Sequence, residues 1–218
     1  MTQLFSPVAN TLARLVLVSL LVAPPLSVAV SYAMMRSNHV TGASLTLEQP
    51  VPFSHRHHAG ELGLDCRYCH GAVERAAFAG MPATTTCMTC HSRLFTNAAM
   101  LEPIRQSLVT ATPVQWNRVH RLPDHVYFDH AVHVHNGIGC STCHGDVQQM
   151  PLIRQVAPLT MSWCLDCHRD PRPYLRPSEA VFDMTWTAPE DQPRRGDELL
   201  ARYAIDPESL VDCSRCHR

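Results

Sequence analysis

The sequence contains few of the residues from which a globular core is usually built. Aromatic residues make up only 6% of its 218 residues, whereas it has 17 prolines. The formal net charge is -1, and no lysine-rich or acidic run is present. These features give no indication of nucleic-acid binding or of electrostatic attraction of a partner. We therefore expect little β-sheet, and an apolar mass other than side chains in the interior.

No cysteine lies outside a single motif, Cys-x-x-Cys-His, which occurs five times and uses all ten cysteines. The copies are Cys66-Arg67-Tyr68-Cys69-His70, Cys87-Met88-Thr89-Cys90-His91, Cys140-Ser141-Thr142-Cys143-His144, Cys164-Leu165-Asp166-Cys167-His168 and Cys213-Ser214-Arg215-Cys216-His217. The motif is typical of covalent c-type haem attachment, in which the thiols bond the porphyrin edge and the histidine binds iron as the proximal ligand.

Two alternatives explain the motifs less well. Zinc sites pair two such motifs, so an odd number would leave one unpartnered. A disulfide framework does not explain why histidine follows every second cysteine. The sequence therefore predicts five covalently bound haem c groups. The predicted proximal ligands are His70, His91, His144, His168 and His217.

The haems account for the missing core and set the expected fold class. We expect a mainly irregular chain with short α-helices wrapped around five haems, after one N-terminal transmembrane helix. Short helical patterns are found at Pro103–Leu108 and Asp197–Tyr203. Residues 170–196 are rich in proline, which predicts an extended loop lying over the surface.

An uncharged segment, residues 15–35, lies between Arg14 and Arg36 and is long enough to cross a bilayer as a helix. Pro24 and Pro25 would kink this helix or divide it. A cleaved signal peptide is the alternative interpretation. We expect an uncleaved single-pass anchor in the cell membrane. Because covalent haem attachment takes place outside the cytoplasm, the haem domain should lie on the periplasmic side.

The motifs form two pairs and one single copy. Each pair follows the pattern Phe-x-His-x-x-His, at Phe53–His58 and at Phe128–His133, which indicates an internal repeat. The predicted organisation is an anchor at residues 1–36, a tether at 37–52 and a pentahaem domain at 53–218. Within that domain, residues 53–95 and 128–170 are two-haem repeats, and residues 197–218 hold the fifth haem.

The sixth iron ligand decides whether a haem can bind small molecules or only pass electrons. Two histidines three residues apart share one helical face and diverge slightly, so they can reach two neighbouring irons. The predicted distal ligands are His55, His58, His130 and His133, with His120 as the fifth. The remaining histidines, His39, His57, His125 and His135, are expected to be exposed or bonded to propionates. Met81, Met150 and Met161 are alternative ligands for one haem.

Three stretches resemble a known family. FSHRHHAGELGLDCRYCHGAVERAAFAGMPATTTCMTCH, VYFDHAVHVHNGIGCSTCHGDV and APLTMSWCLDCHRDP are similar to the pentahaem cytochrome c component of bacterial alternative complex III. The Phe-x-His-x-x-His units are also similar to the wider cytochrome c3/c7 class. The likeness covers about residues 50–175 and the last motif. The sequence departs from this family in its anchor, where Pro24 and Pro25 argue against a straight transmembrane helix.

The resemblance implies a membrane complex that oxidises quinol. In such a complex, integral-membrane subunits bind quinol, an iron–sulfur subunit lies beside the cytochrome, and electrons leave to a periplasmic carrier or a terminal oxidase. We therefore predict an electron-transfer subunit that is not an enzyme by itself. One alternative is a membrane-anchored quinol dehydrogenase cytochrome that acts directly on quinol, and another is a multihaem reductase with one open haem.

Overall fold

The structure is a computed structural model that describes residues 6–217. The chain divides after Gly42 into two units. The first contains α1 (Pro7–Met35) and the short α2 (Asn38–Thr41). Ser6 caps α1 by accepting a hydrogen bond from the backbone N–H of Ala9, and Pro7 occupies the first helical position, where no hydrogen bond is lost.

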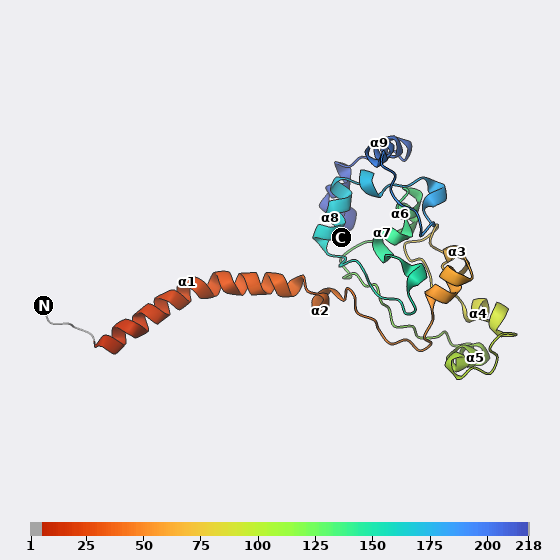
Figure 1. The fold of residues 1–218 in the computed structure, drawn as a ribbon, viewed down its shortest axis with the longest axis horizontal. Coiled ribbons are helices and arrows are strands. Elements are labelled where there is room, and N and C mark those ends of the chain that lie inside the picture. Colours follow the sequence, from red (N-terminus) through yellow and green to blue (C-terminus); the bar gives the residue numbers. More distant parts are fainter. Residues whose placement is uncertain (1–5, 218) are drawn as a thin grey trace. The chain divides into compact units, whose positions relative to one another are not determined.

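The helix α1 remains continuous through Pro24 and Pro25 and bends along its length instead of dividing (Figure 1). The Ser27 hydroxyl donates a 2.8 Å hydrogen bond to the Pro24 carbonyl, one of the local adjustments that allow proline in such helices. By length and composition, α1 can cross a membrane. A signal sequence would share these properties. Length and composition therefore make α1 a candidate anchor without distinguishing it from a signal sequence.

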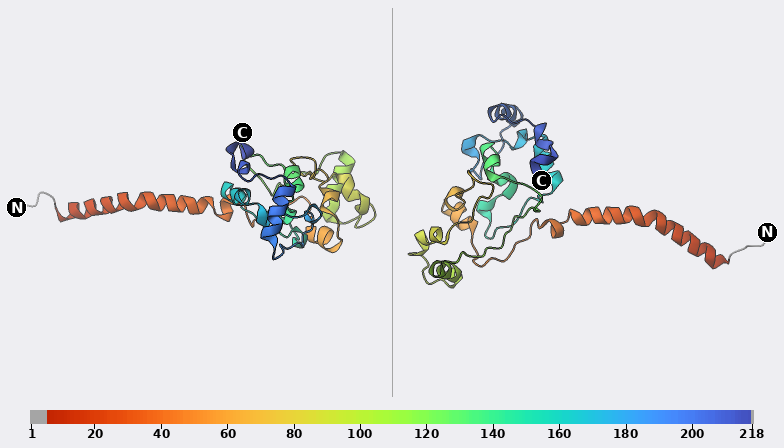
Figure 2. Two further views of the ribbon diagram at one scale, coloured as in Figure 1. Left: turned by 90° about the horizontal axis from the view of Figure 1, so that it is seen from above. Right: turned by 180° about the vertical axis from the view of Figure 1, so that it is seen from behind.

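The second unit, from Ala43 onward, consists of short helices joined by long irregular segments (Figure 2). Within its described residues no β-strand forms, and only isolated bridges occur. Its α-helices are α3 (Cys66–Cys69), α4 (Thr84–His91), α5 (Glu102–Thr110), α6 (His130–His135), α7 (Cys140–His144), α8 (Met161–Arg169), α9 (Gln192–Arg202) and α10 (Cys213–Cys216). The π-helix η1 covers Arg56–Glu61, and the 3-10 helices are η2 (Ala99–Leu101), η3 (Val147–Gln149), η4 (Arg172–Tyr174), η5 (Ser178–Ala180) and η6 (Ser209–Val211).

The expected fold class, an irregular chain with short helices, is confirmed for the described residues, and α5 and α9 confirm the two predicted helical patterns. Every Cys-x-x-Cys-His motif has its two cysteines on one short helix, namely α3, α4, α7, α8 or α10. One helical turn brings residues three apart to the same face. Each helix can therefore present both thiols of its motif on one side.

The side-chain core is small, as the composition predicts. Among the described residues, the buried apolar ones are Ala43, Val51, Val73, Ile104, Met150, Ala157, Leu175, Val181 and Leu199. Of these, only Leu175 and Val181 are large side chains with less than 2% of their surface exposed. A unit of this length would ordinarily bury many more large apolar side chains.

Much of the proline-rich segment 170–196 is exposed at the surface, but some of its residues are buried and pack inward. Besides Leu175 and Val181, it contributes the buried Arg176, which is 5% exposed. The Arg176 guanidinium donates to the Ser141 hydroxyl (2.6 Å), and the Val181 carbonyl accepts from the Cys140 N–H (3.2 Å). The segment packs inward because it covers the third haem motif. A Cβ at Gly139 would lie 2.2 Å from the guanidinium carbon, so a larger residue there would displace the Arg176 side chain.

Candidate haem sites

Histidines from separate parts of the chain face one another in pairs. The ring centroids are 6.2 Å apart for His58 and His91, and 6.2 Å apart for His133 and His168. The rings of His130 and His144 are nearly parallel, with their centroids 6.3 Å apart. A metal bound between two imidazoles needs about 6 Å, since each metal–nitrogen bond is about 2 Å and each nitrogen lies about 1 Å from its ring centre. Each pair therefore has the spacing for one iron.

The last motif has a similar partner. The rings of His125 and His217 lie 5.7 Å apart at an interplanar angle of 18°. The backbone holds this arrangement, because the Tyr127 N–H donates to the Cys216 carbonyl (2.7 Å) and Val126 forms a bridge with His217. The two rings come from parts of the sequence that are 92 residues apart.

The first motif places His70 beside His55. Burial, together with the neighbouring His70 and His58, lowers the pKa of His55 to about 4. Burial also lowers the pKa of His144 to about 3, with His120 as the next cause. Both imidazoles are therefore neutral at ordinary pH, which is the state that binds a metal.

The orientation of the rings matches iron ligation. The Nδ1 atoms of seven candidate ligands lie within hydrogen-bond distance of backbone carbonyl oxygens, which fixes the tautomer and leaves Nε2 free for a metal. The pairs are His58–Ser54 (2.9 Å), His70–Gly80 (2.7 Å), His91–Leu94 (3.2 Å), His130–Ala77 (2.8 Å), His133–Asp129 (2.7 Å), His168–Leu210 (3.0 Å) and His217–His125 (3.3 Å). The residues present therefore fit haem iron bound from both sides.

The sequence predicts His120 as a distal ligand, and the structure places its ring against that of His144. Its Nε2 is 3.2 Å from Nδ1 of His144, and the two ring centroids are 4.4 Å apart. It therefore lies behind the proximal ligand of the third motif, whereas His125 faces His217. No local sequence pattern distinguishes His125 from His120, because the position of His125 depends on the backbone contact with the C-terminal motif.

The other histidines and the candidate methionines are not found in such pairs. His39, His57 and His135 are exposed. Nδ1 of His57 lies 2.8 Å from the Glu61 carboxylate. Nδ1 of His135 lies 2.7 Å from the Ala131 carbonyl. Of the methionines, Met81 and Met161 are exposed, and Met150 is buried.

Contacts between the motifs give their order through the molecule. The Tyr68 and Thr89 hydroxyls are 2.8 Å apart and join the first motif to the second. The thiols of Cys66 and Cys140 are hydrogen-bonded, which lowers the pKa of Cys66 to about 7 and raises that of Cys140. The first motif therefore lies between the second and the third.

The other end of the series follows in the same way. Burial, together with the neighbouring Cys164, raises the pKa of Cys143 to about 11. Cys164 is in turn an electrostatic neighbour of Cys216. Nδ1 of His168 also contacts the Leu210 carbonyl, just before the fifth motif. The motifs thus follow one another in the order second, first, third, fourth, fifth.

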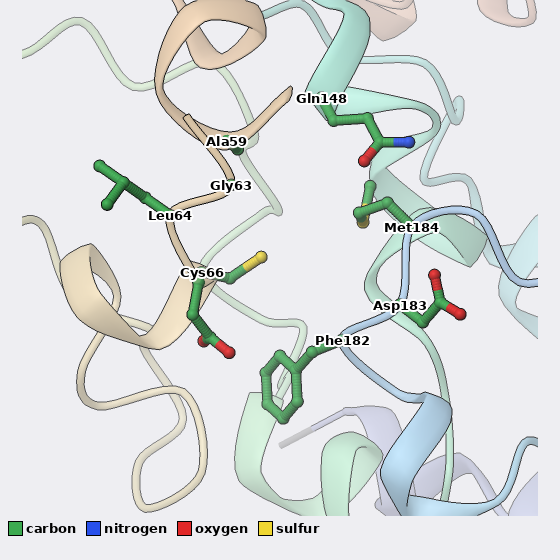
Figure 3. A pocket seen from close by; sticks show the side chains of 9 residues that line it. Ala59, Gly63, Leu64, Cys66, Gln148, Phe182, Asp183 and Met184 are labelled. Atoms are coloured by element: carbon green, nitrogen blue, oxygen red, sulfur yellow. The ribbon is translucent and has the colours of Figure 1, made fainter. Parts of the chain in front are cut away.

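A cavity of about 250 Å³ opens beside the first motif. The Cys66 sulfur points into it from α3, with Gln148 and Met184 on the opposite side (Figure 3). Its lining is completed by residues of 59–65 and by Phe182 and Asp183. The thiol that would bond a porphyrin edge is therefore directed into open space between the two repeats.

Comparison with known proteins agrees with these sites. Residues 126–218 match the family described as cytochrome c7 and related cytochrome c. Residues 32–101 match the class III cytochrome c family. The chain is also 28% identical, over 171 residues, to the multihaem cytochrome c subunit of menaquinone reductase from Nitratidesulfovibrio vulgaris, covering 78% of this chain and 68% of that protein. Together with the repeated motif, these matches show that the protein is a multihaem cytochrome c.

Proposed function

We propose that this cytochrome is the electron-transfer subunit of a membrane complex that oxidises quinol, and that it holds five haems, each between two histidines. The observation that supports this most directly is the set of imidazole pairs at the spacing of one metal, with Nε2 free. When bound, each haem supplies an iron that alternates between the ferric and ferrous states and so carries one electron. Histidine on both sides leaves no iron position for substrate, so the subunit is not an enzyme by itself.

The proposed axial pairs follow the contacts described above. They are His55 with His70, His58 with His91, His130 with His144, His133 with His168, and His125 with His217. In this assignment His125 replaces His120 as the fifth distal ligand. The ten motif cysteines attach the porphyrins covalently.

The order of the motifs defines the proposed electron path, with the second and fifth motifs at its ends. Beside the second motif, Leu94 and Phe95 are exposed by 56% and 69%. At the other end, Val211 beside the fifth motif is exposed by 42%. Both ends are therefore accessible to partners, as a conductor between two redox proteins requires.

We assign the complex to the alternative complex III type on the resemblance of the repeats to its pentahaem cytochrome. The relative from Nitratidesulfovibrio vulgaris supports a quinone-linked complex, since its name places it in menaquinone reductase. The proposed partners are integral-membrane subunits, a periplasmic acceptor and an iron–sulfur subunit. In this arrangement α1 lies in the membrane lipid, and the haem unit lies on the periplasmic side.

The same similarity favours a second candidate function, in which electrons run in the opposite direction and reduce a quinone. The two candidates need the same axial ligands and the same path. They differ in the potentials of the haems relative to the quinone couple, and in the partner that donates electrons. A complex purified from membranes can be tested in both directions.

The experiment combines a haem count, spectroscopy and turnover. Mass spectrometry should find five covalent haem adducts, and a redox titration followed by electron paramagnetic resonance should show only low-spin centres. In the intact complex, a soluble quinol analogue should reduce the haems. Reduction of a quinone analogue by the prereduced complex, without quinol oxidation, would favour the second candidate. A high-spin centre that binds carbon monoxide would instead indicate a reductase, and quinol oxidation by the isolated cytochrome would indicate a direct dehydrogenase.

A further inference from the structure

We propose that His120 is a positioning residue for the third haem site, where its imidazole holds the proximal ligand His144 and lowers the reduction potential of the iron bound there. The inference rests on the proposed function only in requiring that His144 binds iron through Nε2. His120 is then no axial ligand, but a side chain that acts through one.

The geometry assigns a separate role to each nitrogen of the His144 ring. Nδ1 of His144 lies 3.2 Å from Nε2 of His120, with the rings at 77° to each other. The rings of His130 and His144 are nearly parallel, with their centroids 6.3 Å apart, which is the spacing of a metal-bridged pair. If Nε2 of His144 binds iron, its Nδ1 carries the hydrogen and donates it, so Nε2 of His120 is the acceptor.

This contact is an exception among the ligand histidines. For the other proximal histidines, Nδ1 lies beside a backbone carbonyl, which no substitution can remove. At the third site the acceptor is a side chain. The third site is thus the one proximal position among the described motifs at which a single substitution can alter the hydrogen bond.

His120 is held in place from a neighbouring part of the chain. Three residues before it, the Asn117 N–H donates to the Gln49 side-chain oxygen (3.0 Å), and the Asn117 carbonyl accepts a hydrogen bond from the Gln49 amide (2.8 Å). The Asn117 side chain also donates to the Glu48 carbonyl (2.6 Å). His120 itself is half-buried. A site supported in this way keeps its first ligand in a fixed orientation.

The chemical consequence concerns the stability of the ferric state. A ligand imidazole that donates its Nδ1 hydrogen becomes a stronger base and a better electron donor to the metal. The oxidised form is then stabilised, and the potential falls. Because the third motif is in the middle of the series of five, His120 would set the potential at the centre of the electron path.

The test compares three variants of the full-length protein by redox titration with electron paramagnetic resonance. His120→Leu removes the acceptor, and His120→Gln supplies an amide oxygen in its place. His39→Leu makes the same change at an exposed histidine of α2. We expect His120→Leu to raise one potential by about 59 mV, a tenfold change in the reduced-to-oxidised ratio of a one-electron couple. His120→Gln should recover at least half of this shift, and His39→Leu should change nothing.

The outcomes separate this inference from the proposed function. An unchanged titration of His120→Leu, or an equal shift of all the centres, would overturn the inference and leave the proposed function intact. A high-spin, carbon monoxide-binding centre in His120→Leu would overturn it by making His120 an axial ligand. If the leucine variant does not accumulate, a smaller shift of one centre in His120→Gln supports the inference, and no shift overturns it. Wild-type protein with fewer than five adducts would count against the proposed function instead.

Discussion

The two repeats place their proposed distal histidines in nearly the same way. In the first, the Phe53 ring lies 4.9 Å from His55, edge-on at 86°, and 4.3 Å from His58, stacked at 26°. In the second, the Phe128 ring lies 4.7 Å from His130 at 89° and 4.4 Å from His133 at 28°. One phenylalanine thus orients both histidines of each repeat, one by its edge and one by its face.

The residue after each phenylalanine repeats its role as well. The Ser54 hydroxyl accepts a hydrogen bond from the His57 N–H (3.2 Å), and the Asp129 carboxylate accepts from the Val132 N–H (3.3 Å). The following segments nevertheless differ, since η1 is a π-helix and α6 is an α-helix. The helix type is therefore not what fixes the histidines. The contacts that both repeats share are phenylalanine stacking and the cap.

The repeats differ in how they are supported by their neighbours. Nδ1 of His130 lies 2.8 Å from the Ala77 carbonyl, which belongs to the first repeat. The Ala131 N–H also donates to the Ala76 carbonyl (3.3 Å). His55 is the corresponding residue of the first repeat, and its Nδ1 is buried without a partner. The second repeat therefore uses the first as part of its scaffold, whereas His55 of the first repeat makes no corresponding contact.

The largest expected effect comes from removing equivalent distal ligands. We expect His58→Ala and His133→Ala each to convert one low-spin haem to a high-spin centre that binds carbon monoxide, because each removes one of two axial nitrogens. Optical spectra with and without carbon monoxide measure this change. The exposed His57→Ala is the matched control and should leave the spectrum unchanged. An effect in only one repeat would show that the two units are not equivalent.

The equivalence of the repeats is accessible from the sequence because it depends on local spacing. The positions of His55, His58, His130 and His133 follow from helical geometry, and the structure brings each of them to a proximal histidine. The partner of His217 cannot be predicted from local spacing in the sequence. It depends on the contact between Tyr127 and Cys216, and no local pattern encodes a pairing across so many residues.

Composition is an incomplete guide where tertiary packing decides the outcome. The prolines of residues 170–196 predict a surface loop, and much of the segment is exposed, but Leu175 within it is completely buried. Proline restricts the backbone and does not determine what the chain covers. Pro24 and Pro25 predict a kinked or divided helix, and α1 bends along its length but continues through them without dividing (Figure 1). The cost of proline within a helix concerns the local hydrogen bonds, and these are adjusted within one turn.

The contact between the repeats gives the next largest effect. A Cβ at Gly60, in η1, would lie 2.3 Å from the Gln148 carbonyl oxygen of η3. Gly60→Ala should therefore force the repeats apart and lower the free energy of unfolding by about 2 kcal/mol, as overpacking commonly does. Gly71→Ala is the control, since a Cβ there would lie 3.6 Å from the Arg67 carbonyl oxygen, an ordinary contact distance. Chemical denaturation curves that coincide for both variants would refute this contact.

A smaller effect is expected at the two phenylalanines. Phe53→Leu and Phe128→Leu keep an apolar side chain but lose the ring contacts with the histidines, which are worth about 1 kcal/mol. We expect equal losses of unfolding free energy, measured by denaturation, and altered ferric spectra of the haems concerned. A loss at Phe128 that greatly exceeds the loss at Phe53 would mean that the stacking contributes unequally to the repeats.

The smallest effect is expected at the caps. Ser54→Ala and Asp129→Ala each remove a side-chain acceptor for one backbone N–H, at a cost of about 0.5–1 kcal/mol of unfolding free energy. The two caps differ in charge, so only Asp129 can favour the ferric state of a nearby iron electrostatically. Asp129→Asn should therefore preserve stability and raise one haem potential, while Ser54→Asn should leave the potentials unchanged. Equal potentials in all four variants would show that the caps act through the backbone alone, and that the charge of Asp129 is screened by solvent.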